Sequence, residues 1–463
     1  MGKGSPVLHR VKRGLALPIT GVPLSSDINE AEKSEYTALI AEDYPDMRPS
    51  FKVKEGDLVK RGDILFEDRK NPGVLFTSTA CGKVSSINKG EKRAFISAVI
   101  SITEDDNNAE KNELSYKSYA GKEISNLTST DIRELLIESG LWTAFRSRPY
   151  EKIPAVDAKP DALFVTVIDS NPLAPEPTVL VNEYKEQFEA GLKVLSIFKE
   201  DAKFFYCKDN KSDHHVSDFA DAEIHEFEGR HPAGTAGFHI HSLYPVNRAR
   251  VAWHIGYQDV IAVGALFLTG KQMISRVVTV AGSAAEKPAY VKTRLGADIS
   301  SITADRATGE EVRVISGSVF NGRDTDTEST GFLGRYHNQV TLLKDDSSRR
   351  FLGWLAPGSN IFSVTNLFLS SLFPSKKFNF TTDRFGGHRT PVPFTSYQKV
   401  FAFELLSVPI LRALLSGDLE TAESLGVLEL AEEDVSLLTF VCPSKNEYGP
   451  LLRNVLNRLE KEA

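Results

Sequence analysis

The spacing of apolar and polar residues divides the chain into segments of different periodicity. From residue 48 to 104, short alternating apolar runs are separated by glycines, which is typical of strands in a small barrel or sandwich. Helical spacing begins at residue 128, β-type runs return after residue 270, and helical spacing dominates again after 395. The pattern predicts an α+β multidomain chain with domains at 1–125, 126–260, 261–330 and 331–463, the last ending in helices.

The second segment has the element order of a parallel α/β layer. Residues 129–140 predict a helix capped by Ser129 and ended by Gly140. The continuous apolar run 162–169 is typical of a strand that is buried on both faces. An amphipathic helix, a second strand and a closing apolar run are expected at 183–198, 203–207 and 259–270.

Local signals predict particular turns and caps. Ser444 together with Glu447 predicts a capping box for the last helix. Glycines at turns of the first segment are expected to adopt positive φ, and these are Gly56, Gly62, Gly82 and Gly90.

Composition and charge exclude several classes of protein. Apolar residues make up 41% and charged residues 25% of the 463 residues, without repeats, so a globular chain is expected. The net charge of −7, with no basic stripe, argues against a nucleic-acid partner. The longest apolar stretch, residues 260–268, is shorter than the roughly 20 residues that a membrane helix needs.

The N-terminus and the cysteines favour a cytoplasmic protein. The basic first residues lack the apolar core of a secretory signal. Cys81, Cys207 and Cys442 lie far apart and form no CxxC motif, so we expect reduced thiols that pack in the interior.

Six stretches, in order along the chain, carry a resemblance to a known family. Together they resemble NqrA, the first of the six subunits of the Na+-translocating NADH:quinone oxidoreductases (Na+-NQR), and the resemblance covers essentially the whole chain. The stretches are KRGLALPITGVP (12–23), HPAGTAGFHIHSLYPVN (231–247), VAWHIGYQDVIAVGALFLTG (251–270), VRVISGSV (312–319), GFLGRYHNQV (331–340) and FVCPSKNEYGPLLR (440–453).

The resemblance implies a function within a larger assembly. It implies a peripheral subunit on the cytoplasmic face of the bacterial inner membrane, in a six-subunit translocase that oxidises NADH, reduces ubiquinone and pumps sodium ions. Its partners would be the other five subunits, NqrB to NqrF, with the membrane protein NqrB foremost. FMN, FAD and the iron–sulfur centres would belong to those partners, and ubiquinone is a possible ligand of this chain.

The first segment also resembles the lipoyl and biotinyl carrier domains, which attach a cofactor to a lysine at a hairpin tip. The stretch GDILFEDRKNPGVLF (62–76) places Asn71 or Pro72 at the carrier position, and neither can form the amide link. Lys70 is one place off, so on a strand its side chain would point to the wrong face. We expect no attached cofactor.

The second segment resembles the Rossmann-like flavin domain of the NADH-oxidising subunit of respiratory complex I. Such a domain needs a glycine-rich loop, because phosphate oxygens must approach backbone N–H groups closely. Residues 139–154 stand at that place with one glycine and with the bulky Trp142, Phe145 and Tyr150. We therefore expect neither FMN nor NADH on this chain.

Two further segments also resemble known domains. Residues 277–302 resemble a soluble-ligand-binding β-grasp (SLBB) module. The C-terminal helices resemble an iron–sulfur domain in which Cys442 alone remains, and one thiol cannot hold a four-iron cluster. A scaffold is the expected role.

Four residues are candidates for contact with quinone. Trp142 and Phe145 with Arg146 and Arg148, in a predicted loop, would offer an aromatic slot with nearby donors for the quinone carbonyls. The alternative, which we favour, is that the rings fill the vacated flavin pocket. No catalytic residue is predicted.

His239 and His241 are weak candidates for a metal site. They share a face if their segment is a strand, and we expect that His231 and His254 could lie near them in the fold, a geometry that zinc could accept. Against a metal stands the absence of any cysteine close in sequence, and backbone hydrogen bonds would satisfy the same rings.

Residues 349–373 are unusually apolar for a surface segment. They would either dock on a membrane partner or form core, and the sequence favours neither.

Two other functions stay open beside the scaffold. One is a quinone- or flavin-binding electron-transfer protein that acts on its own. The other is an adaptor of a ferredoxin-linked electron-transport complex, and three dispersed cysteines argue against it, because such subunits keep cysteine clusters.

Overall fold

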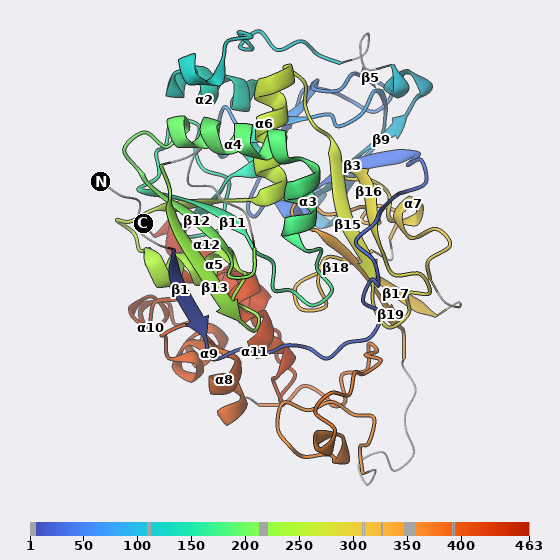
Figure 1. The fold of residues 1–463 in the computed structure, drawn as a ribbon, viewed down its shortest axis with the longest axis vertical. Coiled ribbons are helices and arrows are strands. Elements are labelled where there is room, and N and C mark those ends of the chain that lie inside the picture. Colours follow the sequence, from blue (N-terminus) through green and yellow to red (C-terminus); the bar gives the residue numbers. More distant parts are fainter. Residues whose placement is uncertain are drawn as a thin grey trace.

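Figure 1 shows the computed structural model of the chain, in which the barrel lies at one end and an irregular lobe at the other. The α/β sheet and the β-grasp sheet lie between these two ends. The structure describes residues 6–108, 113–212, 221–307, 309, 311–325, 327–346, 357–390, 392 and 394–462. In this part of the chain, no helix combines the length and the apolar character that crossing a membrane requires.

Two small antiparallel sheets form the barrel and enclose Leu65, Phe66 and Phe76. The barrel-sandwich prediction is confirmed. One sheet orders β3 (Tyr36–Ile40), β9 (Phe95–Ile102), β8 (Gly82–Lys89) and β5 (Leu58–Val59), and the other β4 (Pro49–Phe51), β6 (Ile64–Asp68) and β7 (Leu75–Thr77). Among the turn glycines, φ is positive at Gly56 and Gly62, as predicted, but not at Gly82 and Gly90.

The α/β sheet has parallel strands, with one antiparallel strand at its edge. Alternate residues of β11 face two separate cores: Leu163 and Val165 face one, Ala162 and Phe164 the other. The predicted burial on both faces is confirmed. The sheet order is β1 (Val7–Val11), β13 (Glu223–Gly229), β12 (Lys203–Asp209), β11 (Ala162–Val167), β14 (Ala252–Gly256) and β10 (Arg146–Arg148).

Helices cover both faces of this sheet (Figure 1). The cap of the first helix is Thr128 rather than Ser129, and its hydroxyl accepts from the Asp131 N–H at 3.1 Å. Gly140 follows that helix with a φ of 76°, as predicted. One face carries α2 (Ser129–Glu138), α3 (Pro177–Glu183), α4 (Lys185–Phe198) and α6 (Tyr257–Thr269), and the other carries α5 (Ala236–Leu243).

The β-grasp sheet packs one face on the short helix α7. Its core holds Val278, Val280, Val291 and Leu342. The order is β18 (Arg323–Asp324), β17 (Val312–Ser316), β19 (Gln339–Lys344), β15 (Ser275–Ala281), β16 (Ala289–Arg294) and β2 (Ile28–Glu30), with α7 at Ile299–Thr303.

The C-terminal helices pack against the second face of the α/β sheet. The predicted capping box of the last helix is wrong: Glu447 is the cap without a side-chain bond, and the Ser444 hydroxyl donates to Thr390 O at 2.9 Å. The helices are α8 (Thr395–Val400), α9 (Ser407–Ser416), α10 (Leu419–Ser424), α11 (Ser436–Phe440) and α12 (Tyr448–Lys461). Short 3-10 helices are η1 (Ala41–Asp43), η2 (Glu91–Arg93), η3 (Glu104–Asn107), η4 (Ile124–Asn126), η5 (Leu141–Ala144), η7 (Leu369–Leu372), η8 (Val427–Glu429) and η9 (Glu432–Val435).

The division into domains differs from the predicted one in three places. β1 joins the α/β sheet and β2 joins the β-grasp sheet, so the first residues do not belong to the barrel. Helix α6 runs through the boundary expected at residue 260, and β19 lies beyond the one expected at 330. Pairing between distant parts of the chain leaves no local periodicity that could predict it.

Candidate functional site

The α/β sheet contains one place where a ligand crevice is expected. Strand β11 has two neighbours in the sheet. One is β12, the next strand along the chain, and the other is β14, which follows β12 and β13 in the sequence. In open α/β sheets, ligands bind at the carboxyl ends of the strands where the strand order reverses in this way. Here that place lies between Asp169 and Ser170, which follow β11, and Tyr257 and Gln258, which follow β14.

The β-grasp sheet occupies this crevice. The Gln258 side chain pairs with the backbone of Val277, donating to its carbonyl at 2.8 Å and accepting from its N–H at 3.0 Å. Gln339 Nε2 donates to Pro172 O at 2.8 Å. Thr279 Oγ1 donates to Leu173 O at 2.5 Å. The chain's own strands β15 and β19 thus take the hydrogen bonds that a ligand would make.

The loop after β11 also lacks the features that bind a phosphate. No glycine occurs between residues 168 and 176, so side chains hold the backbone away from an incoming group. Asp169 lies in this loop and accepts from Asn171 N and Asn171 Nδ2, both at 3.0 Å. Burial raises the pKa of Asp169. A carboxyl group here does not favour an anionic ligand.

A glycine-rich turn does occur after β13, at a place where the sequence analysis predicts no phosphate loop. Gly229 and Gly234 precede α5 with the four-residue spacing of a phosphate loop but without its lysine, and Gly237 is the second residue of α5. A Cβ on Gly237 would lie 2.3 Å from Asp434 Oδ1. The carboxylate of Asp434, from the C-terminal helices, therefore fills the space that a phosphate would need.

A buried ionic cluster surrounds Asp434. Arg148 is fully buried and lies 2.8 Å from Asp434 Oδ2 and 3.3 Å from Glu433 Oε1. It also pairs with Glu151, which accepts from His254 Nε2 at 3.0 Å. The cluster joins β10 to η9.

The pKa values in the cluster follow from burial and charge. Burial opposes charge on Glu151, but Arg148, His254 and Arg146 hold its pKa well below the usual range. Burial raises the pKa of Asp434 more than Arg148 lowers it. Burial also lowers the pKa of His254 to about 4, so its ring is neutral at pH 7.

The four quinone candidates lie together, but not in an open slot. Arg146 and Arg148 belong to strand β10 rather than to a loop, which corrects the sequence-based expectation. Arg146 pairs with Glu151 at 2.8 Å, and its guanidinium lies 4.5 Å from the Tyr336 ring centroid.

Trp142 and Phe145 are both 0% exposed. Trp142 meets Phe145 and Trp253 edge-on at centroid distances of 5.6 Å, and its Nε1 donates to Pro154 O at 2.9 Å. Phe145 stacks on Phe198 at 5.3 Å. Both rings are therefore packed in the interior of the α/β domain.

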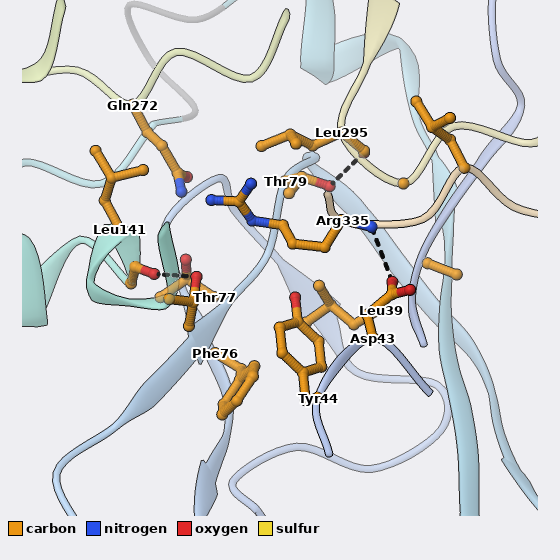
Figure 2. A pocket seen from close by; sticks show the side chains of 15 residues that line it. Leu39, Asp43, Tyr44, Phe76, Thr77, Thr79, Leu141, Gln272, Leu295 and Arg335 are labelled. Atoms are coloured by element: carbon orange, nitrogen blue, oxygen red, sulfur yellow. Dashed lines mark hydrogen bonds between the residues drawn. The ribbon is translucent and has the colours of Figure 1, made fainter. Parts of the chain in front are cut away.

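A small pocket lies where the barrel, the α/β domain and the β-grasp domain meet (Figure 2). Figure 2 shows Tyr44 and Thr77 of the barrel, Gln272 and Arg335 around its centre. The volume is about 30 Å³, which holds two or three water molecules at roughly 10–15 Å³ each. Arg335 is paired with Asp259 at 3.0 Å. A quinone ring does not fit.

The candidate metal ligands lie on a helix, not on a strand. His239 and His241 belong to α5, where residues two apart point in different directions. His239 Nε2 hydrogen-bonds Ala233 O at 2.9 Å. His241 bonds Glu429 Oε2 at 2.7 Å through Nδ1 and accepts from Glu404 N through Nε2. The described residues contain no cluster of three or more His, Cys, Asp or Glu with a metal-binding arrangement.

The carrier-type hairpin is docked on the α/β domain. Asn71 Nδ2 donates to Ile153 O at 3.1 Å, and a Cβ on Gly73 would lie 2.9 Å from the Val156 side chain. Lys70 forms an ion pair with Asp46. The tip at which a carrier domain presents its cofactor is thus a contact between domains.

The three cysteines are buried, as predicted. Cys442 Sγ accepts from Tyr397 Oη at 3.1 Å and from Asn446 N at 3.4 Å. Burial opposes the thiolate, but the Tyr397 and Tyr448 hydroxyls lower the pKa of Cys442 overall.

The fold and the site define a class of protein: a multidomain chain of cofactor-type domains whose crevice is filled by its own residues. The matched families are the NqrA N-terminal barrel-sandwich hybrid domain at residues 9–103, the NqrA second alpha/beta domain at 127–272 and the NQRA C-terminal (SLBB) domain at 277–327.

Full-length relatives give the same result. The A subunit of the Na(+)-translocating NADH-quinone reductase of Neisseria meningitidis serogroup B is 46% identical over 98% of this chain and 99% of its own. The A subunits of the same reductase in Hahella chejuensis and Vibrio anguillarum are also 46% identical over the same shares. The chain belongs to the NqrA family of the Na+-translocating NADH-quinone reductases.

A solved structure gives a weaker match. The NAD+-reducing [NiFe]-hydrogenase in its H2-reduced state pairs with 51% of this chain and 50% of its own at 12% identity, with a TM-score of 0.37. This similarity is too low to support an argument about the relation to flavin subunits.

Proposed function

We propose that this chain is the peripheral NqrA component of a Na+-translocating NADH:ubiquinone reductase on the cytoplasmic face of the bacterial inner membrane. Within that complex it acts as a scaffold and binds neither flavin nor an iron–sulfur cluster. The observation that carries the proposal is the pairing of Gln258 with Val277, through which the β-grasp sheet closes the ligand crevice of the α/β domain.

The charges beside the crevice support the same conclusion. The phosphate of FMN would meet Asp434 at the glycine-rich turn after β13 and Asp169 after β11. Both groups are carboxyls, and the cation beside Asp434, Arg148, already pairs with that carboxyl at 2.8 Å, so a phosphate there would meet like charge or displace the pair. The descent of the α/β domain from a complex I type flavin domain is part of this proposal.

The cofactors and the quinone are bound by other parts of the complex. FMN, FAD and the iron–sulfur centres reside in NqrB to NqrF, and NqrB provides the main attachment. The buried rings of Trp142 and Phe145 favour packing over quinone contact, so ubiquinone is a ligand of the assembled complex rather than of these residues.

The test compares the isolated chain with the complex. The chain is purified alone, and its flavin absorption band and iron content are measured. It is then added to membranes of a strain that lacks NqrA. A colourless chain that restores Na+-dependent NADH:quinone reductase activity is expected. Stoichiometric flavin or iron on the isolated chain would mean that it is an electron-transfer protein in its own right.

A further inference from the structure

The lobe at residues 357–390 has an inner and an outer face. Phe362, Phe378 and Phe380 turn inward and pack on one another and on Phe440, with ring centroids 5.6 to 6.5 Å apart. This aromatic core fixes the lobe on the C-terminal helices. The apolar character that the sequence shows in 349–373 is therefore partly core, and residues 349–356 lie outside the described residues.

The outer face exposes large apolar side chains within one short stretch. We call this stretch the 367–373 surface. Its members are Leu367, 75% exposed, Leu369, 49%, Leu372, 70%, and Phe373, 61%. The last two line a shallow groove with Pro374, Ser375 and Lys376. So many exposed apolar groups in seven positions mark an interaction site.

The charge around this surface is opposite to that of the chain. The whole chain carries −7, whereas residues 357–382 contain Lys376 and Lys377 and no acidic residue. Lys377 is exposed. Lys376 donates to Ser359 O at 2.8 Å and so ties the lobe together. Exposed apolar groups beside basic ones are the pattern of side chains that enter a lipid interface with anionic headgroups.

We propose that the 367–373 surface enters the headgroup region of an anionic lipid bilayer, with Lys377 at the level of the phosphates. This inference rests on the proposed peripheral location, since that location puts a membrane within reach. A bilayer imposes no shape on its partner, which suits an irregular segment. Figure 1 places the lobe, in orange, at the end of the molecule opposite to β5, so the barrel would point away from the lipid.

The experiment measures sedimentation of the full chain with vesicles of phosphatidylcholine, with and without phosphatidylglycerol. We expect binding to the anionic vesicles only, weakened by salt. Leu372→Ser with Phe373→Ser should lower the apparent affinity by at least about tenfold, because the apolar groups that would enter the interface are lost. Lys377→Ala should lower it by roughly fivefold.

Matched controls lie at the far end of the molecule. Leu58→Ser on β5 removes a leucine that is 79% exposed, and Lys54→Ala removes an exposed lysine. Both should bind vesicles as the wild type does. Thermal unfolding of every variant should match the wild type, because each substituted side chain is exposed.

Three results would overturn the proposal. The first is absence of binding to anionic vesicles, and the second is binding that L372S/F373S leaves unchanged. The third is loss of co-purification of L372S/F373S with partner subunits in detergent while no form binds vesicles, which would assign the surface to a protein contact. Failure of the proposed function is distinguishable from these three results, because the wild-type chain itself would then not join the complex.

Discussion

Arg148 of β10 and Asp434 of η9 lie 2.8 Å apart, and both side chains are completely buried. The pair connects the edge of the α/β sheet to the C-terminal helices. Glu151 and Glu433 pair with the same guanidinium, so Arg148 contacts three carboxyl groups from two parts of the chain, and Glu151 also pairs with Arg146. The C-terminal domain is therefore held in place by buried charge as well as by apolar packing.

Replacing Arg148 with Met should destabilise the chain strongly. The substitution keeps the apolar stem but leaves the buried Asp434 without the cation that pairs with it, which costs about 3–5 kcal/mol. Urea unfolding followed by fluorescence measures the change. Arg10→Met is the control, because Arg10 and Glu228 are 73% and 45% exposed and such a pair contributes less than about 1 kcal/mol. Equal effects of the two substitutions would contradict the role of the cluster.

The ion pairs of Asp106 predict that the stability of the chain depends on pH. Asp106 is buried and accepts from Arg61 Nε, Arg294 and Cys81 N, each at 2.8 Å. Burial alone would raise its pKa, but these bonds lower it from 3.8 to about 2. The lowered value means that the ionised form stabilises the folded state by about 2 kcal/mol above pH 4.

This contribution should vanish as the pH falls from about 4 to 2, through the lowered pKa. Asp106→Asn should therefore be less stable than the wild type at pH 7, and the difference should shrink over that interval. Thermal midpoints at a series of pH values measure it. The exposed Asp201 gives the control substitution Asp201→Asn, which should follow the wild-type curve. A difference for Asp106→Asn that does not depend on pH would refute the assignment.

The sequence predicted the elements better than their connections. The run 162–169 was recognised as a buried strand because it is almost entirely apolar, and β11 is buried throughout. The joining of β1 to a strand more than 200 residues away could not be predicted, because pairing partners leave no local mark.

In the candidate site, too, the contacts between residues far apart in the sequence could not be predicted. The size of Trp142 can be read from the sequence, but its complete burial among rings from other elements appears only in the folded chain. The carboxylate that faces Gly237 comes from residue 434, and only the folded chain brings the two together. The two-residue spacing of His239 and His241 is compatible with one face of a strand, whereas tertiary packing selects a helix there.

The docked hairpin predicts that a carrier lysine cannot be restored by one substitution. Asn71→Lys places a lysine at the position of the attachment site, but the tip contacts Ile153 and Val156 of the α/β domain. A modifying enzyme cannot reach it there. Intact-mass measurement after expression with biotin and lipoate should show no added group, while the host's own carrier proteins are modified. An added biotinyl or lipoyl mass would show that the hairpin is free.

Gly237 predicts a steric effect that depends on Asp434. Gly237→Ala puts a Cβ 2.3 Å from the carboxylate, which must shift within the buried cluster. The expected loss is about 1–3 kcal/mol, even though Ala favours helices. Gly256→Ala is the matched control, since no atom lies within 4 Å of the added Cβ. Urea unfolding compares the two, and a stabilised Gly237→Ala chain would mean that the carboxylate is not held against the turn.

The substitution Trp142→Phe distinguishes a packing role of Trp142 from a role in binding quinone. It removes the Nε1 bond to Pro154 O and leaves a void, so stability should fall by about 1–3 kcal/mol. If the ring only fills the interior, KM for quinone in the assembled complex should not change. Phe198→Leu is the control, because Phe198 packs on the same rings from α4 without being a quinone candidate. A raised KM for Trp142→Phe alone, at wild-type kcat, would instead place quinone beside this residue.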